Sequence, residues 1–510
     1  MKKSPLLITL SGLAALTGCG TAEPPKPNII YFLADDLGYG EVGCYGQTLI
    51  HTPNIDGLAQ SGMRFTQHYS GSAVCAPARC ILLTGQHSGH AYIRGNHEWG
   101  ERGEVWNFAR ASEDPGLEGQ YPLADSIVTI AERLREAGYR TGLVGKWGLG
   151  APGSEGDPNN QGFDLFYGYN CQRQAHTYYP LHLWKNQEKD ILGNSLVPPN
   201  TKLPEGADPY DPASYAPFNQ EAYAPDRMIT EALDFIERSG EDPFFLYFAS
   251  PIPHAPLQAP QEWVDRYVEI FGEEEPYLGQ QGYFPHRYPM AAYAAMVSYM
   301  DHQLGQLIEK LKELGKYENT LILFSSDNGP SFAGGANPDW FNASEFRVAH
   351  GYGKGFLHEG GIRVPMIASW PGRIEAGSET GILSAFYDIF PTFCEIARID
   401  PEVPVDGISM VPTLLGKGKQ QEHDFLYWGF PEYGGQQAVR LENWKGIRKN
   451  MQKGNLEIEL YDLENDPKEM NNLAAQNPEM VERIRTIMEQ EHRKSEISRF
   501  WLKPLDVLTP

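Results

Sequence analysis

The chain has 510 residues, of which 41% are hydrophobic and 12% aromatic, enough for a sizeable core in one large α/β unit or in two to three domains. Its formal net charge of -24 argues against a nucleic-acid-binding protein, which needs a basic surface. The charge does not exclude a small anionic substrate, because a site can be locally basic on an acidic protein.

The first 19 residues follow the pattern of a bacterial export signal. Two lysines precede an apolar run over 6–16 that is too short to span a bilayer. The run ends in Leu-Thr-Gly-Cys, which resembles a lipobox, although a plain secretory signal cut nearby stays open. We therefore expect an exported bacterial lipoprotein, periplasmic or on the outer membrane and cell surface. Lipidated Cys19 would be its membrane anchor, and residues 20–27 would form a tether.

Buried strands alternate with helices over most of the chain. Four apolar runs predict strands over 28–34, 141–145, 243–249 and 320–326. Helical periodicity occurs between them, over 125–139 and 291–315. This order predicts an α/β catalytic domain over 28–415, with a large, mostly parallel sheet sandwiched by helices. Short strand-like pieces and a final helix predict a smaller antiparallel α+β subdomain over 416–510.

Polar side chains follow all four predicted strands, namely Asp35, Asp36, Lys146, His254, Asp327 and Asn328. Each alone could be a helix cap, a turn residue or a solvated charge. Because ligands bind beyond the carboxyl ends of strands in open α/β sheets, the set predicts a site. Its oxygen donors suit Ca²⁺, Mg²⁺ less well, and not Zn²⁺. The lysine, the histidine and a further Lys354 could hold an anion beside that cation.

The segment SAVCAPARCILLTG, residues 72–85, holds Cys75 and Cys80. The six cysteines are irregularly spaced and show no C-x-x-C pair, so zinc is not indicated. A disulfide, a metal clip and a modified residue are the alternatives for this pair.

These segments together resemble the type I, formylglycine-dependent sulfatases of the alkaline-phosphatase-like superfamily. The family signature C-x-P-x-R-x-x-L-x-T-G is matched by Cys75, Pro77, Arg79, Leu82, Thr84 and Gly85. Further matching segments follow in family order, namely ADDLGYG, GKWGLG, PHAP, SSDNG and EGGIRVP. The resemblance spans residues 28–475 and implies a sulfuric ester hydrolase.

The resemblance also implies residue roles. A maturation enzyme would oxidise Cys75 to formylglycine, whose hydrate attacks sulfate and later re-forms the aldehyde. One Ca²⁺ would be bound by Asp35, Asp36, modified Cys75, Asp327 and Asn328. Arg79 would pair with the modified side chain, and Lys146 and Lys354 would bind sulfate. His254 would protonate the departing alcohol, and Asp327 would take a proton from the attacking hydroxyl. A structural ion pair for Arg79 and a hydrogen-bonded loop histidine for His254 are the alternatives.

One position departs from the family pattern. Gly148 stands where the family usually has a histidine, the proposed base for collapse of the sulfated intermediate. Asp327 could take over that role, or His176 could enter the site and bind substrate.

Cys80 occupies a variable position of the family signature. Because RCILL looks like the start of a helix behind the nucleophile, Cys80 is expected to be a buried apolar residue.

The substrate is suggested by residues 166–186, which are aromatic and polar together. They resemble the pocket region of bacterial carbohydrate sulfatases acting on sulfated galactose or N-acetylgalactosamine, and a packed aromatic hairpin is equally compatible. We expect an exo-acting glycan sulfatase involved in sulfated polysaccharide degradation. The alternatives are a broad aryl sulfatase, a phosphate or phosphonate ester hydrolase on the same fold, and a non-catalytic binder of sulfated glycans.

Overall fold

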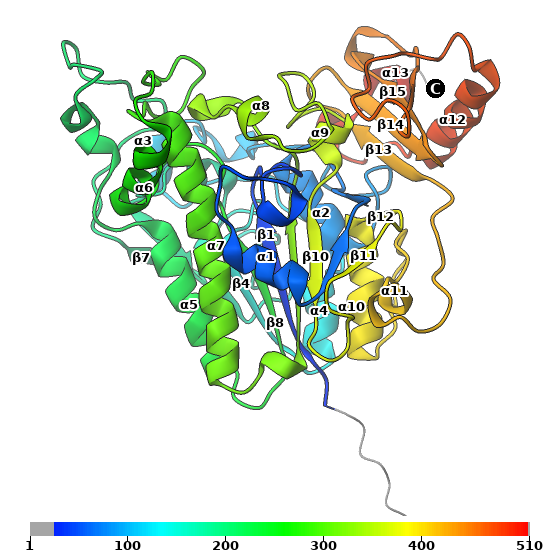
Figure 1. Ribbon diagram of the computed structural model, residues 1–510, viewed down its shortest axis with the longest axis horizontal. Helices are drawn as coiled ribbons and strands as arrows, with labels where there is room; N and C mark the ends of the chain where they lie inside the picture. The colour runs from blue at the N-terminus through cyan, green and yellow to red at the C-terminus, as the bar shows by residue number, and fades with distance from the viewer. Residues whose placement is uncertain (1–24, 508–510) are drawn as a thin grey trace, which may run out of the picture.

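Figure 1 shows the computed structural model, which describes residues 25–507. The expected signal peptide, most of the tether and Cys19 lie outside the described residues and stay predictions. Among the described residues, no helix combines the length and apolarity required to cross a membrane.

A ten-stranded sheet forms the centre of the molecule, in the order β11-β2-β10-β9-β1-β8-β4-β5-β6-β7. Its five middle strands run parallel, with every position of β1, β8 and β9 buried. They are β9 (Thr320–Ser326), β1 (Asn28–Ala34), β8 (Phe244–Ala249), β4 (Arg140–Lys146) and β5 (Leu165–Tyr169). The four strands predicted from apolar runs are therefore confirmed, and they form the parallel core of the sheet.

Shorter strands complete the sheet on both sides. β10 pairs antiparallel with β9 and β2, and β6 pairs antiparallel with β5 and β7. These strands are β2 (Met63–Phe65), β6 (His182–Lys185), β7 (Glu188–Ile191), β10 (Met366–Ser369) and β11 (Ser378–Thr380). A two-stranded sheet of β3 (His68–Tyr69) and β12 (Ser384–Ala385) lies apart from the large one.

Helices cover both faces of the sheet, because alternate side chains of its buried strands point to opposite sides. Ile30 and Phe32 of β1 pack in one core with α1 (Pro53–Gln60), α5 (Ala224–Arg238), α6 (Gln261–Phe271) and α7 (Pro289–Glu313). Ile29 and Tyr31 pack on the other side with α2 (Cys75–Thr84), α4 (Ile130–Glu136) and α10 (Ile389–Ala397). The predicted three-layer α/β architecture is confirmed.

The two helices predicted from periodicity differ in how closely their observed starts match the expected ones. α7 begins at Pro289, two residues before the expected start. α4 begins only at Ile130, five residues after the start expected at 125, because Thr129 and Glu132 form a capping box. The cap fixes the first turn there, and 125–129 are left as a loop.

The C-terminal part is an antiparallel sheet of β13 (Leu426–Phe430), β14 (Gln436–Leu441), β15 (Trp444–Arg448) and β16 (Glu459–Asp462). One of its faces packs against α12 (Pro478–Glu491). Its other face, through Trp428 and Ile447, belongs to the same core as α2 and α10. The antiparallel α+β character is confirmed, while a boundary at residue 415 stays a prediction. The fold is completed by short helices, namely α3 (Phe108–Glu113), α8 (Pro338–Phe341), α9 (Glu359–Ile362), α11 (Val411–Leu415) and α13 (Lys503–Asp506).

Candidate active site

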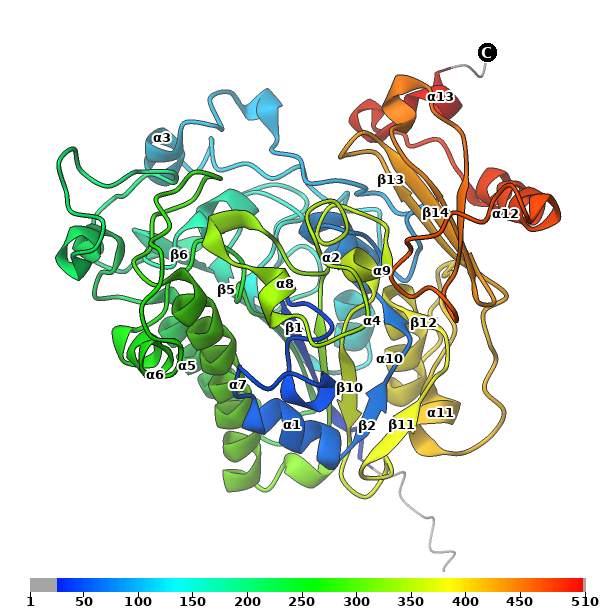
Figure 2. The same ribbon diagram turned by 45° about the horizontal axis from the view of Figure 1, so that its top comes forward.

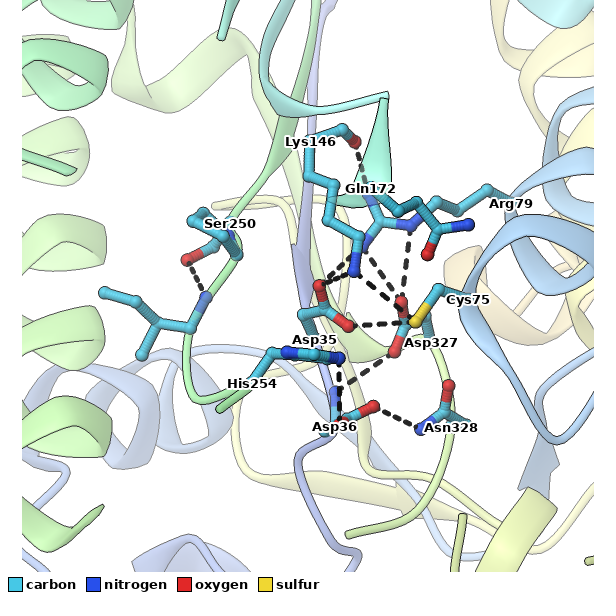
Figure 3. A network of polar contacts seen from close by, with 12 residues as sticks. Asp35, Asp36, Cys75, Arg79, Lys146, Gln172, Ser250, His254, Asp327 and Asn328 are labelled. Atoms are coloured by element: carbon cyan, nitrogen blue, oxygen red, sulfur yellow. Dashed lines mark hydrogen bonds and ion pairs between the residues drawn. The ribbon is translucent and has the colours of Figure 1, made fainter. Parts of the chain in front are cut away.

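The carboxyl ends of β1, β4 and β9 bring the predicted polar residues into one buried cluster (Figure 3). Asp327 follows β9, and its backbone N–H donates to Ala34 O at 3.0 Å, while its Oδ1 accepts from the Asp36 N–H at 3.1 Å. Asp36 adopts a left-handed backbone with φ of 68°, a conformation that aspartate tolerates better than most side chains. The sharp turn directs Asp35 and Asp36 toward the same space.

Cys75 is the first residue of α2 and is buried beneath this cluster. Its thiol lies 3.2 Å from Asp35 Oδ1, 3.4 Å from Lys146 Nζ and 3.7 Å from Lys354 Nζ. Burial, reinforced by the charge of Asp35, raises the pKa of the thiol well above its usual value. Because only the thiolate is a good nucleophile, unmodified Cys75 is poorly suited to attack an ester.

The helix expected at RCILL begins four residues earlier than Arg79, at Cys75 itself. Pro77 permits this start because the first turn of a helix leaves its backbone N–H groups without partners, so proline loses no bond there. Cys80 is buried in the core, as expected, and the described cysteines are all free thiols. Cys75 and Cys80 are thus not joined by a disulfide, and the buried group of potential metal ligands that contains Cys75 does not include Cys80.

Arg79 lies behind the cluster and is fully buried. Its Nη2 is 2.9 Å from Asp327 Oδ2 and 3.5 Å from Asp35 Oδ2, and its Nη1 donates to the Lys146 carbonyl. In this structure Arg79 therefore pairs with two carboxylates.

The acidic residues of the cluster differ in electrostatic environment. Burial opposes ionisation of Asp35, but Lys146, His254 and Arg79 hold the pKa of its carboxyl well below the usual range. Burial and the charge of Asp35 raise the pKa of Asp327 to about 7, although Arg79 opposes them. Two carboxyl groups with pKa values displaced in opposite directions are typical of sites that handle protons or metals.

The donor set fits a hard cation such as Ca²⁺. Asn328 Oδ1 is buried and has no hydrogen-bond partner, while the amide nitrogen of the same side chain donates to Asp36 Oδ1 at 2.8 Å. An unpaired buried oxygen is costly unless something else binds it. Lys146 Nζ contacts Asp35, and Lys354 Nζ lies 2.8 Å from Asp36 Oδ2. The carboxylate oxygens of Asp35 and Asp36 and the amide oxygen of Asn328 are the kind of ligand that Ca²⁺ prefers.

Two histidines face the cluster. His254 Nδ1 donates to Ala255 O at 2.6 Å, so its Nε2, 3.6 Å from Asp36 Oδ2, is directed into the site. His176 stacks on His254 with ring centroids 5.7 Å apart and planes 12° apart, and is thus brought to the site as the sequence suggested. Burial, with Lys354 and Lys146 nearby, holds the pKa of His254 well below its usual value. Burial and His254 do the same to His176.

Gly148 is explained by a residue that the sequence did not identify. Its φ is +84°, and a Cβ there would lie 2.8 Å from Gln172 Cγ. Gln172 Nε2 donates to Asn96 Oδ1 at 3.1 Å, and that oxygen also accepts from the Ala76 N–H at 2.9 Å. The glutamine thus fills the space beside Gly148 and is linked, through Asn96, to the start of α2. Only the aromatic and polar character of 166–186 hinted at Gln172.

A cavity of about 780 Å³ opens above the cluster, within the roughly 300–1,000 Å³ of typical ligand sites. Its lining includes His254 and Lys354 from the cluster and Gln172, Arg173 and His176 from the segment 166–186. In that segment Tyr167 and Gly168 of β5 pair antiparallel with β6, and the connecting turn faces the cavity. Both alternatives for 166–186 hold in part, since its strands are a packed hairpin and its turn lines a pocket.

The C-terminal subdomain also reaches the site. Gln436 of β14 donates to Gly355 O at 2.7 Å and accepts from the Leu357 N–H at 3.1 Å. These bonds hold the loop that carries Lys354. Tyr433, in the turn before β14, lines the cavity itself. No motif or periodicity in the sequence indicates either contact.

Family comparisons agree with this geometry. A model of the sulfatase family matches residues 27–399, and a model of the C-terminal part of N-sulphoglucosamine sulphohydrolase matches 349–496. The chain belongs to the sulfatase family. This sulfatase is a sulfuric ester hydrolase acting on sulfate esters of sugars or aryl compounds, with the expected alkaline-phosphatase-like fold.

Named relatives include sugar and aryl sulfatases. N-acetylgalactosamine-6-sulfatase of Canis lupus familiaris is 32% identical, covering 83% of this chain and 72% of its own length. Arylsulfatase A of Homo sapiens is 32% identical, covering 85% and 76%. The structure of Ps i-CgsB in complex with k-i-k-neocarrahexaose is 27% identical with a TM-score of 0.71, covering 95% and 98%. A phosphonate monoester hydrolase of Agrobacterium radiobacter, 21% identical with a TM-score of 0.63 over 91% and 96%, shares the fold alone.

Proposed function

We propose that this sulfatase removes sulfate from a sulfated carbohydrate, a galactose or N-acetylgalactosamine sulfate, using formylglycine derived from Cys75 and one Ca²⁺. The observation that carries the proposal is the position of Cys75. Its neutral, buried thiol lies among Asp35, Lys146 and Lys354, directly below a cavity of ligand size. A thiol so placed is a poor nucleophile, whereas an aldehyde hydrate there would face an anion between two ammonium groups.

The absent groups would supply the nucleophile and part of the positive charge. Formylglycine would provide a hydrated aldehyde hydroxyl, and Asp35, Asp36, Asp327 and Asn328 would hold Ca²⁺, which would supply positive charge for the sulfate. Lys146 and Lys354 bind and orient the sulfate, because both ammonium groups point at the Cys75 side chain. In this proposal Asp327, whose charge acts on the Cys75 side chain, accepts a proton from the attacking hydroxyl.

The two stacked histidines would move the remaining protons. His254 presents Nε2 to the cavity, so it can donate a proton to the departing sugar oxygen once a bound anion stabilises its imidazolium. His176 lines the same cavity and has no hydrogen-bonded ring partner among the described residues. In this proposal His176 serves as the base that Gly148 cannot provide. His176→Asn should lower kcat by a larger factor than it changes KM, and it should change the pH profile of kcat.

The sugar assignment is supported by the pocket and by the relatives. The turn 172–176 combines amide, guanidinium and imidazole groups beside Tyr283 and Trp106, a mixture suited to hydroxyl recognition and ring stacking. The dog relative is named N-acetylgalactosamine-6-sulfatase, and Ps i-CgsB was solved in complex with k-i-k-neocarrahexaose.

Two further parts of the proposal concern processing. A sulfatase-maturating enzyme would act on Cys75, and lipidation of Cys19 would attach the exported protein to a bacterial membrane. Mass spectrometry of the mature N-terminal peptide should show an acylated cysteine at position 19. A peptide that begins elsewhere without lipid would contradict the anchor while leaving the hydrolase proposal intact.

The decisive experiment is mass spectrometry of the Cys75 peptide after co-expression with a maturation enzyme, followed by sulfate release from a panel of sulfated sugars. We expect the aldehyde at position 75 and release from galactose or N-acetylgalactosamine sulfates. An unmodified thiol in an active preparation would refute the mechanism. A tenfold preference for phosphate esters in kcat/KM, about 1.4 kcal/mol, would instead favour the phosphate or phosphonate hydrolase alternative.

A further inference from the structure

A second cavity adjoins the one above Cys75. Its volume is about 280 Å³, and its lining includes Gln281, Phe332, His350 and Phe356. Four residues line both cavities, namely Ser331, Ala333, Lys354 and Tyr433. Lys354 is one of the two lysines that point at Cys75, so the two cavities meet beside the position expected for the reacting sulfate. A substrate therefore has room in two adjoining cavities next to its sulfated unit.

Tyr433 stands at the junction of the two cavities in an unusual conformation. Its φ is +48°, although bulky side chains rarely occupy the left-handed region, and its side chain is 55% exposed. Such strain persists only where surrounding contacts enforce it, and it concentrates at functional sites. Here the Glu432 carboxylate accepts from the Asn96 N–H at 3.0 Å, and the Tyr433 ring meets Phe356 edge-on at 5.8 Å. An exposed aromatic ring is thus held rigidly beside Lys354.

A second exposed aromatic ring lies at the rim of the larger cavity. Trp106 is 71% exposed, and the Arg173 guanidinium lies 5.0 Å from its ring centroid. The same guanidinium donates to the Val105 and Trp106 carbonyls and so holds the backbone that carries the ring. Trp106 precedes α3, while Tyr433 belongs to the β13–β14 turn. These elements lie on opposite sides of the upper part of the molecule, with α8 and α9 between them (Figures 1 and 2). Both rings line the larger cavity, and Tyr433 lines the smaller cavity as well.

We infer that the sulfated sugar is an internal unit of an oligosaccharide or polysaccharide, which runs from Trp106 across Lys354 to Tyr433 and the smaller cavity. This inference rests on the proposed function and departs from the exo mode expected from the sequence. A terminal sugar needs only one pocket, whereas here a second cavity shares Lys354 and Tyr433 with the first. Rigid aromatic faces offer large contact area at low entropic cost, which suits them to stacking on sugar rings.

The test uses the mature, full-length enzyme with hexasaccharides of chondroitin sulfate and of carrageenan, N-acetylgalactosamine 6-sulfate, and 4-nitrophenyl sulfate. Tandem mass spectrometry of partially digested hexasaccharide locates the unit that has lost sulfate. We expect loss from interior units. Trp106→Ala and Tyr433→Ala should each lower kcat/KM for the hexasaccharide about tenfold, as for truncation of an aromatic contact residue. The loss should be several-fold smaller with 4-nitrophenyl sulfate, which is too small to reach both rings.

Matched controls are Trp340→Ala and Tyr210→Ala, which remove rings that are 42% and 53% exposed and line neither cavity. Both should keep full activity on every substrate. Desulfation confined to terminal units, or equal losses on small and large substrates, would overturn the inference. Sulfate release from N-acetylgalactosamine 6-sulfate but from no interior unit would overturn it and leave the proposed function standing. No release from any saccharide would overturn both.

Discussion

The floor and the rim of the site are built differently. The floor consists of charged side chains at the ends of parallel strands, such as Asp35, Lys146 and Asp327, all fully buried and joined by ion pairs. The rim consists of loops and one turn from the C-terminal subdomain, and it includes exposed rings and strained backbone. The difference indicates that reaction chemistry is placed on the rigid sheet, whereas substrate selection is assigned to segments that can vary without disturbing the core.

The largest expected effect concerns the floor. Cys75→Ala should abolish sulfatase activity, a loss of at least about 10⁴-fold in kcat, because it removes the side chain from which the proposed nucleophile would form. Sulfate release by the purified variant measures it. Cys80→Ala is the matched control from the same helix. It should cost about 1 kcal/mol of stability and leave kcat within about twofold. Comparable activity in Cys75→Ala and wild type would invalidate the assignment of the floor.

Removing the metal tests whether the floor depends on a cation for its stability. Ca²⁺ at 100 times its dissociation constant should raise the free energy of unfolding by about 2.7 kcal/mol. Asn328→Leu removes the unpaired oxygen and should abolish most of that gain. Thermal unfolding with Ca²⁺, with Mg²⁺ and with a chelator provides the readout. Equal stabilisation of wild type and variant by Ca²⁺ would show that Asn328 is not a ligand.

Gly148 lies where the floor meets the rim. Gly148→Ala should lower the free energy of unfolding by about 2 kcal/mol, since it combines φ of +84° with a Cβ 2.8 Å from Gln172 Cγ. Gly153→Ala is a control with φ of +70° and open space around it, so it should cost only the conformational part, about 1 kcal/mol. Denaturant unfolding of both variants, each with and without Gln172→Ala, separates the two contributions. If Gln172→Ala brings no relief to Gly148→Ala, the close contact is not the cause.

The smallest effect concerns Glu432, whose carboxylate accepts from the Asn96 N–H beside Tyr433 in the rim. Burial raises the pKa of the Glu432 carboxyl to about 7 from an ordinary value of 4.5. Between these values the folded protein binds a proton that the unfolded chain has released, so stability falls as pH rises from about 4.5 to 7. Glu432→Gln removes this dependence and should make the protein about 1 kcal/mol more stable than wild type at pH 8. Urea unfolding at pH 5 and pH 8 measures it. Glu442→Gln, at an exposed position, keeps Glu432 and should therefore retain the wild-type change in stability between the two pH values.

Prediction from the sequence succeeded where a signal is local. The four central strands were found because each is a continuous apolar run, and the residues behind them followed from strand ends that meet at one sheet edge. The start of α4 was missed because the capping box at Thr129 and Glu132 overrides the longer apolar periodicity. α2 begins at Cys75, ahead of the start expected at RCILL, because a first helical turn accepts proline.

The contacts that shape the pocket were not predictable, since they join segments far apart in the chain. Gln172 meets Asn96 across 76 positions, and Gln436 meets Gly355 across 81. No periodicity or spacing encodes such pairs, because they arise only when strands from different parts of the chain are packed. The sequence by itself determined the chemistry, through a cysteine motif and oxygen donors placed directly after buried strands. Only the tertiary structure decided what surrounds that chemistry, because loops and a turn of the C-terminal subdomain converge on Lys354 only once both cores have formed.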